Sequence, residues 1–228
     1  MNFYKIVAVL FLFAGTFSFA QKISDNFDWG AGVAGRESVI AGGRISGMKT
    51  QIGGKTWRTD GTIKFSGTSG KDGGYLEMTG KNAFVQFDFA PSGKTTAVAT
   101  GRFTPGDGKT LGFFFGFQSK KSDVNLLFPQ KTDKLLVRLK ETGDIVLQSL
   151  VAGELKNGTG KNSAFKAGEQ VTMTLVTDMD AKIATLTATG KTGTFIKNVA
   201  WKGNPDWGVF AVNQTGNSKL FLEEIIVE

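Results

Sequence analysis

The chain has 228 residues, with 27 Lys and Arg against 20 Asp and Glu, a net charge of +7, and neither histidine nor cysteine. This composition excludes zinc fingers, histidine-based catalytic triads, catalytic thiols, haem or iron–sulfur ligation through those residues, and disulfides. A hydrophobic content of 40% with 21% charged residues is typical of a folded globular chain.

The first 20 residues have the pattern of a secretory signal peptide. Lys5 precedes an apolar run over residues 6–14, and the small residues Ser18 and Ala20 occupy the two positions that signal peptidase reads. We therefore expect cleavage after Ala20 and a product that is secreted or periplasmic. The alternative is a membrane anchor, but the run is shorter than the roughly 20 residues that a spanning helix needs. No later stretch is long and apolar enough, so no membrane span is expected.

Removal of residues 1–20 leaves one expected domain, residues 21–228, with a net charge of +6. Outside the cytosol this basic balance fits anionic partners such as acidic polysaccharides or envelope phosphates, and it does not indicate nucleic acid. Solubility explains the same charge at least as well.

Alternation of apolar and polar residues with a period of two predicts strands along the chain. The alternation is clearest over residues 82–89, 110–118, 133–140 and 170–177. Glycine-rich turns separate about a dozen such runs, and no helical stripe exceeds two turns. Short strands at this spacing predict an all-β domain of the sandwich, jelly-roll or barrel type.

The second half of the chain shows a recurring family pattern. A strand-like run over residues 168–177 meets an acidic turn, a second strand over 181–187 and an apolar strand over 207–213, and residues 221–227 close the chain. This order resembles the concanavalin A-like lectin and glucanase jelly rolls, including laminin-G-like domains.

The resemblance implies a two-sheet antiparallel jelly-roll sandwich in which the first strand, near residues 23–27, lies beside the last. The chain departs from the family's common ending, because the pair Glu223-Glu224 stands where a single acidic residue or an Asp-Asn pair is usual.

Catalysis on glycans is the main functional alternative. Hydrolysis of a glycosidic bond needs two carboxyl groups that flank it, and the Glu-x-Asp-x-x-Glu motif of the family's glucanases is absent. The alginate lyases of the family use a histidine and a tyrosine, but this chain has no histidine and only Tyr75 after processing. These absences favour a non-catalytic protein.

Asp178 and Asp180 are the only carboxylates two residues apart, and they fall at a predicted hairpin tip. Solvated turn residues are the ordinary explanation. Carboxylate oxygens are also calcium ligands, so the pair is a weak candidate for a metal site in a protein for which no cofactor is otherwise expected.

Aromatic and basic side chains supply the candidate ligand site. Trp57 stands between Lys55 and Arg58, where its ring either stacks on a sugar or fills the core. Trp201 and Trp207 are two further tryptophans that could stack on a sugar, and Trp207 opens an apolar strand that indicates a core position.

Alternation over residues 110–118 predicts that Phe114 faces outward between two glycines, as an apolar platform on the concave face of one sheet. Arg102 is expected on the neighbouring strand, where it could pair with a carboxylate or sulfate. Lys120 and Lys121 complete the candidate set. The alternatives are that Phe114 is covered and that the basic residues form a solvated face.

We therefore expect a secreted non-catalytic carbohydrate-binding or adhesion module whose partner is a polysaccharide or cell-surface glycan, with acidic polysaccharide as one candidate. A glycan hydrolase or lyase with an atypical site and a structural envelope protein remain the alternatives.

Overall fold

The computed structural model describes residues 22–68, 73–104, 112–120, 132–140, 142–162, 165–215 and 219–228. The predicted signal peptide (residues 1–20), the first part of the predicted strand 110–118, and Lys121 lie outside these ranges. The described residues form strands and contain no helix that could cross a membrane.

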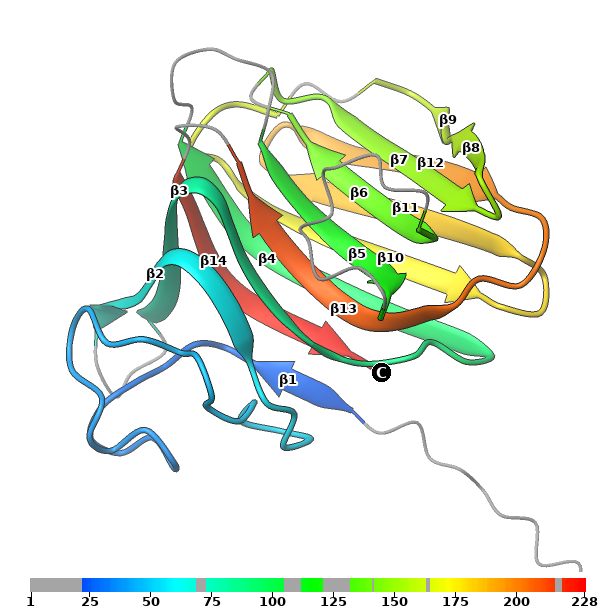
Figure 1. Ribbon diagram of the computed structural model, residues 1–228. Helices are drawn as coiled ribbons and strands as arrows, with labels where there is room; N and C mark the ends of the chain where they lie inside the picture. The colour runs from blue at the N-terminus through cyan, green and yellow to red at the C-terminus, as the bar shows by residue number, and fades with distance from the viewer. Residues whose placement is uncertain are drawn as a thin grey trace, which may run out of the picture.

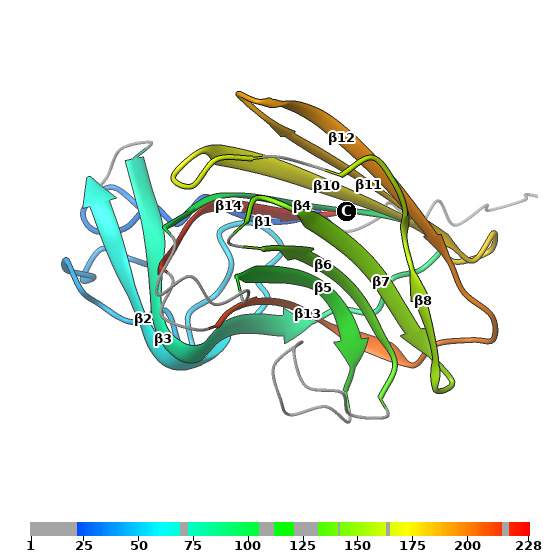
Figure 2. The ribbon, with the colours of Figure 1, turned by 90° about the horizontal axis from the view of Figure 1, so that it is seen from above.

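The strands lie in two antiparallel sheets that pack face to face (Figures 1 and 2). Sheet I has the order β3–β14–β4–β10–β11–β12–β9, and β1 pairs with β14 beside the end of β3. Apart from β3 (Gly73–Asp88), its strands are β1 (Ile23–Asp25), β4 (Lys94–Thr104), β9 (Thr159–Gly160), β10 (Gln170–Asp178), β11 (Ile183–Gly190), β12 (Gly193–Ala200) and β14 (Lys219–Val227).

Sheet II has the order β3–β13–β5–β6–β7–β8. Besides β3, its strands are β5 (Phe113–Ser119), β6 (Lys134–Leu139), β7 (Ile145–Val151), β8 (Glu154–Asn157) and β13 (Trp207–Gln214).

The long ribbon of β2 (Arg58–Thr68) and β3 joins the two sheets along one side of the sandwich. Residues 76–78 of β3 pair with β14 in sheet I, whereas residues 83–88 pair with β13 in sheet II. The β2 register shifts between Asp60 and Thr62, and such a bulge bends a strand. On the other side, the consecutive strands β8 and β9 pair with β7 in sheet II and β12 in sheet I.

The inner faces of both sheets form one apolar core. Its centre is aromatic: Trp57 packs edge-on against Phe87 at 5.0 Å between ring centroids, and Phe210 lies 5.7 Å from Phe117. These four side chains are fully buried, and each contributes about 1.5–3 kcal/mol by leaving water. Trp201 and Trp207 are each 5% exposed, so the core position predicted for Trp207 is confirmed. The all-β fold predicted from the alternation and the two-sheet antiparallel sandwich implied by the family resemblance are also confirmed.

Candidate functional site

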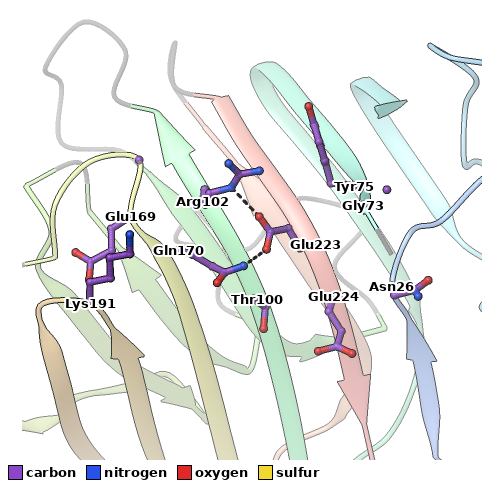
Figure 3. Close-up of a pocket in the computed structure, with 12 residues that line it drawn as sticks. Asn26, Gly73, Tyr75, Thr100, Arg102, Glu169, Gln170, Lys191, Glu223 and Glu224 are labelled. Carbon is purple, nitrogen blue, oxygen red and sulfur yellow. Dashed lines mark hydrogen bonds and ion pairs between the residues drawn. The ribbon is translucent and has the colours of Figure 1, made fainter. Parts of the chain in front are cut away.

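A groove of about 840 Å³ crosses the outer face of sheet I (Figure 3). The residues that line it follow the order of strands in the sheet, from β3 through β14 and β4 to β10. They are Asn26, Gly73, Gly74, Tyr75, Thr100, Arg102, Gly168, Glu169, Gln170, Lys191, Glu223 and Glu224. Because Lys191 follows β11 directly, the groove runs across the strands rather than along them.

A β-bulge in β14 brings two carboxylates into the groove. The register with β4 shifts between Leu222 and Glu224, so Glu223 and Glu224 both lie on the outer face although they are consecutive. The bulge is visible in the sequence pattern. Buried apolar residues recur at every second position up to Leu222, and the next one, Ile225, comes three positions later instead of two.

Glu223 is the centre of a hydrogen-bond network on the groove floor (Figure 3). The Nε of Arg102 donates to Glu223 Oε1 at 2.6 Å, and Gln170 Nε2 donates to the other carboxylate oxygen. Arg102 and Gln170 are cross-strand partners on β4 and β10. The Arg102 side chain is 43% exposed and that of Glu223 is 20% exposed, so solvent or a ligand can reach both groups.

Aromatic rings hold Arg102 from the side of β3 and β14. The Arg102 guanidinium carbon lies 5.9 Å from the Tyr75 ring centroid and 5.8 Å from that of Phe221, within the range of cation–π attraction. The two rings meet edge to face at 5.4 Å. Three side chains from three strands therefore fix one another, while Tyr75 still lines the groove.

Glu169 forms the wall at the other end of the groove. It accepts hydrogen bonds from the Lys166 backbone N–H at 2.9 Å, and from the Thr192 N–H at 2.6 Å and hydroxyl at 2.7 Å. The Lys166 N–H contributes most to lowering the pKa of Glu169, and Thr192 adds to the effect. A Cβ at Gly190 would stand 2.6 Å from Glu169 Oε1, so a side chain there would have to displace the Glu169 carboxylate.

The groove therefore offers fixed planar donors and acceptors beside an aromatic ring. Among the residues that the structure describes, no cluster of three or more Asp or Glu side chains could hold a metal ion.

Of the residues predicted from sequence, Arg102 is the one that lines this groove. Trp57 does not reach the surface: it is fully buried, and its indole N–H donates to Asp25 Oδ2 at 2.9 Å. Of the two alternatives for Trp57, stacking on a sugar is therefore wrong and filling the core is confirmed.

The exposed platform predicted at Phe114 is also wrong. Phe114 is 1% exposed and packs with Val209 and Ala211 on the outer face of sheet II. The neighbouring glycine, Gly116, allows close approach of β6 rather than of a ligand, because a Cβ on Gly116 would lie 1.9 Å from the Leu135 carbonyl oxygen.

The predicted neighbourhood of Arg102 and Phe114 is wrong as well. Arg102 lies on β4 in sheet I and Phe114 lies on β5 in sheet II, with three strands between them in the hydrogen-bonded order. The two residues do not form one site.

Those of the remaining candidates that the structure describes lie away from the groove. Lys120 follows β5 and lies beside Gly208 in sheet II, where a Cβ on that glycine would be 2.5 Å from Lys120 Cγ. Lys121 is outside the described residues. Asp178 accepts the backbone N–H groups of Asp180 at 3.1 Å and Ala181 at 2.8 Å, as expected at a hairpin tip. A calcium role for this pair stays a prediction.

Eleven of the twelve groove residues are not predicted as ligand-binding by the sequence, among them Tyr75, Gln170, Glu223 and Glu224. The phase change in the last strand was the signal for the carboxylates. The position of Tyr75 over Arg102 depends on which strands pair, and residues that far apart in sequence carry no local signal of contact.

No protein-family model matches the sequence, and no curated protein matches it. Solved structures share its fold. Lectin II from Ulex europaeus is 9% identical, with a TM-score of 0.58 over 91% of this chain and 98% of its own. The winged bean acidic lectin complexed with methyl-α-D-galactose is 10% identical, with a TM-score of 0.58 over 91% and 98%. A legume lectin-like domain from Entamoeba histolytica is 6% identical, with a TM-score of 0.54 over 75% and 89%.

The legume lectins are two-sheet antiparallel jelly rolls, so the comparison shows the jelly-roll fold that the strand order suggested. Identities this low carry no residue roles from those lectins to this chain.

Proposed function

We propose that the protein is a secreted, non-catalytic carbohydrate-binding module and that the groove on sheet I is its glycan site. The observation that carries the proposal is the meeting of Tyr75 with the fixed polar groups of Arg102, Glu223 and Gln170 in an open groove. An aromatic face suits the C–H face of a pyranose, and ionised side chains make strong hydrogen bonds to hydroxyls.

The fold comparison supports a carbohydrate ligand. One solved lectin with this fold holds methyl-α-D-galactose and another is complexed with galactose. The fold alone does not fix a function, so the proposal depends on the groove.

The charges in the groove favour a neutral sugar. Arg102 and Lys191 face three carboxylates, Glu169, Glu223 and Glu224, so an anionic sugar would meet more repulsion than attraction. The net charge of +6 on the mature chain still supports binding of acidic polysaccharides through lysines outside the groove, and a test needs both classes of polymer.

Affinity gel electrophoresis tests the proposal. The protein is run through gels that contain β-1,4-galactan or β-1,3-glucan as neutral polymers, and alginate or polygalacturonate as acidic ones. We expect retardation in a neutral gel that the double variant Tyr75→Ala/Arg102→Ala loses and that the control Lys120→Ala in sheet II keeps. If only the acidic gels retard the protein, and the retardation weakens as salt rises to 0.15 M, then binding occurs through surface lysines and not through the groove. Mobility unaffected by any polymer would overturn the function.

A glycan hydrolase is the second candidate, because Glu223 and Glu224 both line the groove. Two observations count against it. Glu223 and Glu224 come from consecutive residues of one strand, so this pair does not flank a bond from opposite sides as hydrolysis requires. Glu223 and Glu169, the third carboxylate of the groove, both already accept hydrogen bonds from fixed donors. Prolonged incubation with the bound polymer should release no new reducing ends. If the wild type releases reducing ends and the Glu224→Gln variant does not, the protein is a hydrolase.

Secretion has its own test. N-terminal sequencing of the exported protein should begin at Gln21, and a product that retains Met1 would contradict the signal peptide.

A further inference from the structure

Four threonines form a straight row across the outer face of sheet I. Thr100 on β4 is the register partner of Thr172 on β10, which pairs with Thr189 on β11, which pairs in turn with Thr194 on β12. The hydroxyls of Thr100 and Thr172 are 3.1 Å apart, as are those of Thr189 and Thr194. We call these four residues the threonine row.

The threonine row begins inside the groove and leaves it. Thr100 lines the groove together with Gln170 and Lys191, whereas Thr194 lies on β12 beyond it. Both the groove and the row run perpendicular to the strands, so the row continues the direction of the groove across the sheet.

The spacing of the row suits a sugar chain. Neighbouring strands are about 4.8 Å apart, which is close to the length of one pyranose unit in an extended chain. Each threonine offers a hydroxyl for hydrogen bonding and a methyl group for contact with C–H groups. The path from β3 to β12 covers five strand steps, or roughly 24 Å, which is room for about four or five units.

The twist of the sheet indicates whether this face suits a single polysaccharide chain or the flat surface of a crystalline polysaccharide. Adjacent strands rotate by about 20–25°, so successive threonines turn about the axis of the row. A single chain can follow this turn by rotating about its linkages, whereas the face of a crystal cannot.

On the side away from Arg102, the surface next to the threonine row is free of charge over β4, β10, β11 and β12. Two further rows on β4, β10, β11 and β12 share its outer face, and all their members are uncharged. The first is Val98, Thr174, Thr187 and Ile196, and the second is Thr96, Val176, Thr185 and Asn198. In a chain with 21% charged residues, this composition favours a neutral ligand over an ionic one.

We infer that the groove and the threonine row together hold an internal stretch of a neutral, extended polysaccharide chain, laid across the strands from Tyr75 to Thr194. The inference rests on the proposed function and deepens it, because it makes the site one for a chain rather than for a single sugar or a chain end.

Matched double variants on the same two strands test the role of the row. Thr172→Val/Thr189→Val removes two hydroxyls from the threonine row, and Thr174→Val/Thr187→Val removes two from the neighbouring row. Calorimetry with oligosaccharides of one to six units, cut from β-1,4-galactan and from the extended polymer β-1,4-glucan, measures each affinity. We expect affinity to rise with length up to four or five units. The in-row variant should bind the hexasaccharide about 5- to 150-fold more weakly, as two lost hydrogen bonds imply, while the control keeps wild-type affinity.

The outcomes separate the two proposals. If one and six units bind with equal affinity and Tyr75→Ala/Arg102→Ala still abolishes binding, the proposal of an extended chain is overturned and the groove remains a site for a single sugar. Equal weakening by both double variants would remove the special role of the threonine row. Absence of binding to every oligosaccharide would overturn both proposals.

Sedimentation velocity should give a monomer, and a dimer that the double variants dissociate would show that a second copy covers this face.

Discussion

The molecule contains two arginine–carboxylate pairs with the same chemistry and different surroundings. The side chains of Arg36 and Asp25 are 1% and 0% exposed, whereas those of Arg102 and Glu223 are 43% and 20% exposed. Burial removes the option of pairing with water, so the first pair holds structure together. The second pair keeps exchanging with solvent and is available to a ligand.

The buried pair closes the N-terminal segment onto the core. Both Asp25 carboxylate oxygens accept from Arg36, and they also accept from the Trp57 indole and the Phe27 backbone N–H. The Arg36 guanidinium also donates to the Asp28 carbonyl oxygen at 2.8 Å, and its carbon lies 5.0 Å from the Phe65 ring centroid. The charges are therefore fully paired, which is the condition under which a buried ion pair is tolerated.

Breaking the buried pair should have the largest effect. Asp25→Ala leaves the Arg36 charge buried without its partner, and we expect the free energy of unfolding to fall by about 3–5 kcal/mol. Denaturant unfolding followed by tryptophan fluorescence measures the change. The control is Asp88→Ala, whose pair with Arg58 is 58% and 49% exposed and should cost less than about 1 kcal/mol. Similar losses in the two variants would refute the distinction between the pairs.

Removing one hydrogen bond of the buried cluster should cost less. Trp57→Phe keeps an aromatic ring in the core but takes the indole donor from Asp25 Oδ2. We expect a loss of about 1–3 kcal/mol in the free energy of unfolding. Trp57→Phe in the Asp25→Ala background gives the coupling between the residues, and strictly additive losses would mean that this hydrogen bond contributes nothing.

The exposed pair should matter for binding and little for stability. Arg102→Ala should change the free energy of unfolding by less than about 1 kcal/mol. The same variant should weaken glycan binding by about 10- to 150-fold, the cost of one lost charge-assisted hydrogen bond. Arg102→Lys keeps the charge without the planar guanidinium and should recover little affinity. A large loss of stability in Arg102→Ala would make this pair structural too.

The smallest effect is expected from pH at the rim of the groove. Hydrogen bonds lower the pKa of Glu169 in the folded protein, so its contribution to stability is complete above the unfolded pKa of about 4.3. That contribution is lost as the pH falls through the lower folded pKa. The protection factor of the Thr192 amide, which is its intrinsic exchange rate divided by its observed exchange rate at the same pH, should therefore fall on acidification, and Glu169→Gln should flatten this dependence. A protection factor that does not change with pH in the wild type would contradict the assignment.

The fold could be predicted because it follows from local alternation. Val171, Met173 and Leu175 alternate with polar residues and form the buried face of β10 as expected. Alternation misled at β5, where both faces are buried: Phe114 and Phe115 are consecutive and both inaccessible. A period of two identifies two faces but does not say whether the second face meets solvent.

The site was harder to predict because it depends on pairing between distant strands. Arg102 was chosen for its charge, but its neighbours Tyr75 and Glu223 lie 27 and 121 positions away in sequence. Which strand pairs with which follows from the bent β2–β3 ribbon and the β14 bulge. Of these two features, the β14 bulge is the one that the sequence pattern indicates.

Amide chemical-shift mapping during titration with a galactan or glucan hexasaccharide tests the central claim most directly, since it reports every face of the protein at once. We predict that the shifts concentrate at Tyr75, Arg102, Gln170 and Glu224 and extend along the threonine row, with the amides of Asp25 and Arg36 unchanged. Shifts confined to the outer face of sheet II around Phe114, with the groove silent, would contradict the claim that the exposed pair on sheet I is the binding site.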